Sequence, residues 1–142
     1  MTDTIARSDT TIRKSVFLKA DKATVWAHLT DAKKLGDWFH PADKDMVEGA
    51  PFRLTSQNDG ERMCWGMVEK MEPTDYMRWA FTVGPLNGIM TTVEWRLEEA
   101  PGGTRLTLTH SGLPEDAEGY SLVFNMDKGW HGFLGNLHNL AV

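Results

Sequence analysis

Few residues in this sequence have the type and spacing that catalysis or metal binding requires. The five histidines are His28, His40, His110, His131 and His138. His131 and His138 are seven residues apart in a segment with helical spacing, which separates their rings by about 10 Å, too far to share a metal ion. We therefore expect no metal site and no cofactor. No activating cation or helix start is evident for Cys64, which lies in a predicted strand, so we expect a packed thiol and not a nucleophile.

His110 is the histidine best placed to act on a ligand. It alternates with Leu106 and Leu108, so it points to the apolar side of its predicted strand. There a neutral imidazole can exchange one hydrogen bond with a ligand. The alternative is a strand-end histidine bonded to the backbone or to water. No paired carboxylates, nucleophile motif or phosphate-binding loop accompanies it, so we lean towards a protein that is not an enzyme.

Six segments have the alternating pattern that is typical of β-strands. The first, residues 12–18, precedes the helical part of the sequence, and the other five follow it at 52–56, 61–71, 76–83, 92–97 and 105–110. Turn residues separate them, among them Asn58-Asp59-Gly60. We therefore expect adjacent antiparallel strands with one apolar and one polar face. The pattern does not decide to which face of the sheet Trp65 points, because both sides of the 61–71 strand carry apolar residues.

Three segments have helical spacing. Asp21 is a suitable cap for a first short helix and Asp31 for a second, which ends near Phe39. Trp38 and Phe39 would then act either as a lid over a cavity or as a plug. A longer helix begins near Asp116 and presents one apolar stripe, which consists of Val123, Met126, Trp130, Leu134, Leu137 and Ala141. Gly129, Gly132 and Gly135 weaken this helix and would let its backbone approach another surface.

This order of elements predicts an α+β fold. A curved six-stranded antiparallel sheet wraps around the long C-terminal helix, and two short helices follow the first strand. The space between sheet and helix is the candidate ligand site. We expect its wall to consist of Trp38, Trp65, Met77, Trp79, Phe81, Val93, Trp95, Leu108, His110, Met126, Trp130 and Leu134.

Length and composition limit the possible partners. The 142 residues suffice for one domain, which we place at residues 11–142 after a flexible tail at 1–10. The net charge is −5 and no basic run exceeds two residues, which argues against nucleic acid or an anionic membrane as partner. One cysteine, no long apolar run and a polar N-terminus predict a cytoplasmic protein without membrane insertion. Six tryptophans and eight methionines suit an aromatic-walled cavity, although they also suit an ordinary core.

Several motifs occur in an order that resembles a known family. They are Trp38-Phe39-His40-Pro41, Gly66-Met67-Val68-Glu69, the segment 102–108, His110-Ser111-Gly112-Leu113-Pro114 and Gly129-Trp130. Together they resemble the START-like (SRPBCC) superfamily, in the branch named for the activator of the heat-shock protein 90 ATPase (AHSA-like). The resemblance implies a helix-grip fold with a deep apolar cavity. Members of the superfamily bind lipids, sterols, polyketides or plant hormones, and some are cyclases or hydratases.

The leading hypothesis is therefore binding of a hydrophobic or aromatic small molecule between the sheet and the C-terminal helix. A second hypothesis, which rests on the family name, is a co-regulator of the chaperone ATPase or a stress-response interaction module. A third is a cyclase or hydratase that uses His110. We expect a monomer or a homodimer.

Overall fold

The structure is a computed structural model, and it describes residues 10–140 except residue 57. The expected tail at 1–10 therefore lies outside the described residues except for Thr10, as does Ala141 at the end of the apolar stripe. The elements in chain order are β1 (Ile12–Leu18), α1 (Lys22–Thr30), α2 (Ala32–Trp38), β2 (Pro51–Thr55), β3 (Arg62–Glu72), β4 (Tyr76–Val83), the short 3-10 helix η2 (Gly84–Leu86), β5 (Thr91–Ala100), β6 (Gly103–Ser111) and α3 (Ala117–Leu140).

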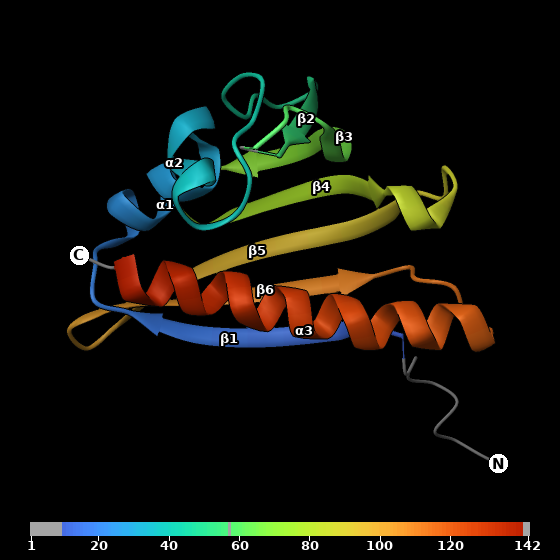
Figure 1. The fold of residues 1–142 in the computed structure, drawn as a ribbon. Coiled ribbons are helices and arrows are strands. Elements are labelled where there is room, and N and C mark those ends of the chain that lie inside the picture. The colour runs from blue at the N-terminus through green and yellow to red at the C-terminus, as the bar shows by residue number, and fades with distance from the viewer. Residues whose placement is uncertain (1–9, 57, 141–142) are drawn as a thin grey trace, which may run out of the picture.

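The strands form one six-stranded antiparallel sheet in the order β1-β6-β5-β4-β3-β2. Strands β2 to β6 are neighbours in the order of the chain, and β1 closes the other edge against β6. Figure 1 shows α3 crossing the sheet in front of β6 and β1, with α1 and α2 beside its C-terminal end. The predicted helix-grip architecture is therefore confirmed.

The two short helices begin where the aspartates indicate. The Asp21 carboxylate accepts a hydrogen bond from the backbone N–H of Thr24, and the Asp31 carboxylate accepts from the N–H groups of Lys33 and Lys34. Each bond satisfies a donor that has no partner within its helix. Asp31 both ends α1 and caps α2, so α2 follows α1 directly.

The burial pattern of β3 shows on which face of the sheet Trp65 lies. Cys64 and Val68 are buried on the inner face, so Trp65 lies on the outer face beside Arg53 of β2. The guanidinium of Arg62 stacks on its ring at 3.6 Å. The expectation that Trp65 lines the interior is therefore wrong. The irregularities in β3 fall between Arg62 and Cys64, where it pairs with β2, and after Val68, where it pairs with β4, and not at Gly66.

Three of the glycines of α3 do not serve close packing within the described chain. A Cβ atom added at Gly129, Gly132 or Gly135 would meet nothing within 4 Å. Their backbones therefore face open space, and the expected approach to another surface is absent among the described residues.

Candidate functional site

The inner face of the sheet and α3 enclose an apolar interior. Strands β4, β5 and β6 supply side chains that are at most 1% exposed, namely Met77, Trp79, Phe81, Val93, Trp95, Leu108 and His110. Helix α3 supplies Trp130 and Leu134, with Met126 half-buried beside them. The structure thus brings together the predicted wall residues with the exception of Trp65.

Aromatic rings fill the middle of this interior. Trp95 contacts Trp38, Trp79 and Trp130 edge to face, with ring centroids 5.9, 5.5 and 5.7 Å apart. Such edge-to-face pairs are favourable beyond the area that they bury. The indoles therefore occupy the centre of the space that the strand pattern assigns to a ligand.

Trp38 acts as a plug. Its indole N–H donates to the backbone carbonyl of His28 at 2.8 Å, and its ring stacks on Phe39. Only 2% of Trp38 is exposed. This side chain therefore joins α1 to α2 and closes that end of the core.

His110 is the centre of a buried hydrogen-bond chain. The hydroxyl of Thr91 donates to the Phe81 carbonyl at 2.6 Å, so its oxygen accepts from His110 Nε2–H at 2.8 Å. Nδ1 of His110 then has no proton and accepts from the indole N–H of Trp130 at 3.0 Å. Burial favours this neutral imidazole and lowers the pKa of His110 to about 4.

The chain of hydrogen bonds connects α3 to three neighbouring strands. Both ring nitrogens of His110 are engaged by protein groups, so neither is free to act as an acid, a base or a ligand contact in this arrangement. The alternative of a structural histidine fits this geometry, although its partners are side chains and not backbone or water. Sequence alternation indicated the face of His110 but carried no signal for Trp130 as its partner.

Two other indoles are buried without a partner. The N–H groups of Trp79 and Trp95 have no acceptor among the described residues, and both side chains are 0% exposed. Trp38 and Trp130, in contrast, each donate to an acceptor. Leaving a buried donor unpaired costs about 1–3 kcal/mol, and such groups are rare in native proteins. The N–H groups of Trp79 and Trp95 therefore mark the place where a hydrogen-bond acceptor would stabilise the interior most.

A groove of about 420 Å³ opens between the segment after β4 and the first half of α3. Its lining includes Leu86 and Ile89 on one side and Gly119, Leu122 and Asn125 on the other. Leu86 belongs to the core and Leu122 packs against it, so the floor of the groove is the edge of the apolar interior. Sequence reasoning missed this opening, because its two sides come from segments that are far apart in the sequence, at 85–89 and 114–125.

The same two segments expose large apolar side chains. Ile89, Met90 and Tyr120 are about half exposed, and Phe124 is 65% exposed. The mouth of the groove is therefore bordered by segments that present apolar surface to solvent, which is typical of an interaction site or a ligand-binding groove.

The remaining reactive side chains show no site. Burial raises the pKa of Cys64 to about 12, which keeps it a protonated thiol as expected. His131 is exposed, and His138 contacts the backbone carbonyl of Phe17 through Nδ1. Within the described residues no group of histidine, cysteine, aspartate and glutamate side chains has the arrangement of a metal site.

Comparison with known proteins assigns the family. Residues 19–141 match the family described as activator of Hsp90 ATPase homolog 1-like protein. Because the match covers most of the chain, the chain belongs to this AHSA-like family of the SRPBCC superfamily. A search of the curated proteins finds no match. None of the helices in the described part of the chain is long and apolar enough to cross a membrane.

Solved structures share the fold over nearly the whole chain. DynU16, from the dynemicin biosynthetic locus, is 30% identical with a TM-score of 0.76 over 92% of this chain, which spans only 46% of the DynU16 chain. CalU16 from Micromonospora echinospora is 25% identical with a TM-score of 0.68, over 89% of this chain and 71% of that one. The Aha1 dimer from Colwellia psychrerythraea is 20% identical with a TM-score of 0.77, over 92% of this chain and 95% of that one. At this identity the similarity shows the fold alone.

Proposed function

We propose that the protein binds a hydrophobic or aromatic small molecule that carries a hydrogen-bond acceptor, between the inner face of the sheet and α3. The observation that carries this proposal is the pair of buried, unpartnered N–H groups of Trp79 and Trp95. A carbonyl, hydroxyl or ether oxygen of a ligand would accept from them and remove the cost of the unpaired donors. The surrounding rings would bind its apolar body.

The groove beside η2 supplies the route of entry. Leu122, Met126 and Trp130 follow each other at four-residue spacing, so they line one face of α3 from the groove to the aromatic cluster. Met126 is half-buried and flexible, and its displacement opens the way inward. Gly129 and Gly132, on either side of Trp130, lower the cost of moving this part of the helix.

The relatives support a role with small molecules. Proteins of the SRPBCC fold bind small molecules, and DynU16 comes from a biosynthetic locus. The binding site proposed here lies in the part of the chain that these structures share.

The test uses Prodan, a neutral naphthalene ketone whose emission responds to polarity and to hydrogen bonding at its carbonyl. We expect saturable binding with blue-shifted emission. Trp79→Phe and Trp95→Phe keep an aromatic ring and remove one donor each, so each variant is expected to weaken binding about tenfold. Trp65→Phe on the outer face is the matched control and retains the wild-type affinity.

Each result bears on the proposal. Absence of saturable binding, or equal affinity in all three variants, would contradict it. A ligand found by native mass spectrometry in protein from its own host, and lost on denaturation, would support it and identify the ligand. Folding of each variant is checked by circular dichroism before the titration.

A further inference from the structure

The arginines of the described chain all lie on the outer face of the sheet. Each strand carries one, and the six are Arg13, Arg53, Arg62, Arg78, Arg96 and Arg105. Five of them alternate with inward-facing neighbours, and Arg62 reaches the same face by stacking on Trp65. In sequence these residues are scattered, and only the pairing of the strands brings them together.

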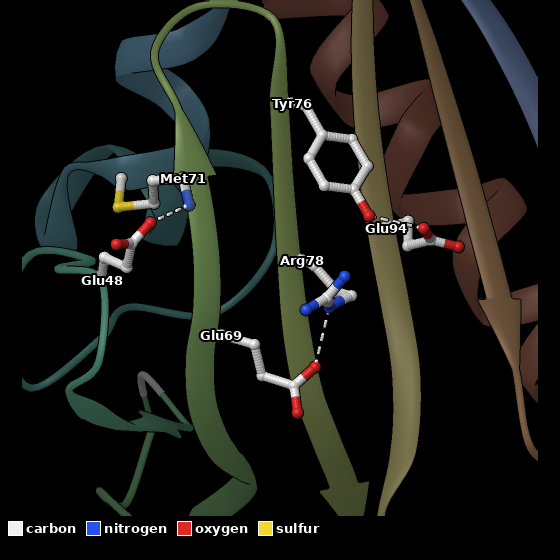
Figure 2. Close-up of polar contacts among 6 residues, drawn as sticks. All are labelled: Glu48, Glu69, Met71, Tyr76, Arg78 and Glu94. Carbon is white, nitrogen blue, oxygen red and sulfur yellow. Dashed lines mark hydrogen bonds and ion pairs between the residues drawn. The ribbon is translucent and has the colours of Figure 1, made fainter.

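Two of the arginines on the β4 to β6 part of this face are already paired. Arg78 donates to Glu69 at 3.0 Å and Arg105 to Glu98 at 2.6 Å. The Tyr76 hydroxyl donates to Glu94 at 2.5 Å, so this carboxylate is also engaged. Figure 2 shows the Arg78 and Tyr76 contacts side by side across β3, β4 and β5, together with Glu48, which accepts from the backbone N–H of Met71.

Arg13 and Arg96 form no ion pair within the described residues. Arg96 lies over the Tyr76 ring, 4.8 Å from its centroid, and its charge contributes only secondarily, after Arg105, to the lowered pKa of Glu98. Neither guanidinium therefore has a carboxylate of its own. Each keeps donors in a planar fork that fits a carboxylate in two parallel hydrogen bonds.

The register places these two guanidiniums on opposite sides of one groove. Arg13 of β1 pairs with Thr109 of β6, and Arg96 of β5 pairs with Thr107 of β6. Two strand spacings, about 10 Å, therefore separate the backbones from which they rise. Thr107 and Thr109 of β6 lie between the two strands, Ser15 of β1 lines the groove beside Arg13, and the groove has a volume of about 550 Å³.

We propose that this groove docks an acidic segment of a partner protein, whose carboxylates bind Arg13 and Arg96. Glu94 and Glu98 line the same groove. They would repel any anion placed against them, so the partner must set its carboxylates on Arg13 and Arg96 and neutral groups elsewhere. A peptide that alternates acidic residues with neutral donors can do this, whereas the closely spaced phosphates of a nucleic acid cannot avoid the two glutamates. This site lies on the face of the sheet opposite the proposed ligand site and does not depend on it.

The test measures fluorescence anisotropy of a labelled peptide of six Glu-Ser repeats at low salt. The double variant R13Q/R96Q removes the two arginine charges of the groove that have no ion pair and leaves the ion pairs of the face intact. We expect it to raise the Kd about tenfold. The control K33Q/K34Q removes the same charge from α2 and is expected to keep the wild-type Kd. Retained Prodan binding in R13Q/R96Q separates this site from the interior.

Three outcomes would overturn the proposal. The first is absence of peptide binding at low salt. The second is equal weakening in R13Q/R96Q and K33Q/K34Q, which would indicate a response to net charge alone. The third is tighter binding of a twelve-nucleotide oligo(dT) than of the acidic peptide, which would assign the surface to nucleic acid.

Discussion

Acidification is expected to destabilise the folded protein through His110. Burial lowers the pKa of this imidazole from 6.5 to about 4 in the folded protein. In the unfolded chain the imidazole is solvated and takes up a proton near pH 6.5. Between these values the unfolded state binds more protons than the folded state, so the free energy of unfolding falls as the pH falls.

The size of the effect follows from the two pKa values. The full difference corresponds to about 3 kcal/mol, since one pKa unit is worth 1.36 kcal/mol. Most of it is lost between pH 6.5 and pH 4, and about 2 kcal/mol is lost between pH 7 and pH 5. Below pH 4 both states bind the proton, and His110 contributes no further slope.

The assay is urea denaturation from pH 7 to pH 5 on the wild type and on His110→Gln. The glutamine amide has an acceptor for the Trp130 N–H and donors for the Thr91 oxygen, but it does not titrate. The four other histidines and the carboxylates are present in both proteins, so their contributions cancel in the difference.

We expect the wild type to lose about 2 kcal/mol more than the variant over this range. Parallel stability curves would refute the reasoning, because they would mean that His110 titrates normally in the folded state. An absolute loss of stability in the variant does not affect the comparison, which concerns only the slope with pH.

Three further substitutions and one labelling experiment test the packing. Gly132→Ala in α3 meets open space and is expected to raise the free energy of unfolding by about 1 kcal/mol, measured by urea denaturation. Gly66→Ala would place a Cβ atom 1.8 Å from the Ala80 carbonyl oxygen and is expected to cost about 3 kcal/mol in the same assay. Asp31→Ala removes the cap of α2 and is expected to lower the thermal midpoint, at a cost of about 1 kcal/mol. Cys64 is expected to react with a thiol reagent only after denaturation, because burial keeps it protonated.

The local pattern of the sequence was sufficient to predict the elements and most of their faces. Alternation placed Trp79, Trp95 and His110 on the inner side of their strands, because successive side chains of a strand point to opposite faces. The aspartate caps marked the starts of α1 and α2, because a capping bond spans only a few residues. These features depend on neighbours within a few positions, and so they can be read from the chain alone.

Features that depend on contacts between distant segments came only from the tertiary structure. Trp65 has apolar neighbours on both sides in sequence, and only the pairing of β3 with β2 and β4 assigns it to the outer face. The hydrogen bond from Trp130 to His110 joins a helix to a strand twenty residues away. Alternation gave no indication that the Trp79 and Trp95 N–H groups would lack acceptors, because that depends on every segment packed around them.

The distribution of charge also depends partly on the sequence alone and partly on the tertiary structure. Composition predicted an acidic protein without basic runs, and that remains true of the chain as a whole. Strand pairing nevertheless brings Arg13 and Arg96, eighty-three positions apart, to the two sides of one groove. Each side chain is given by the sequence, but the distance between the two is set by the register of a sheet that pairs β1 with β6 and β6 with β5.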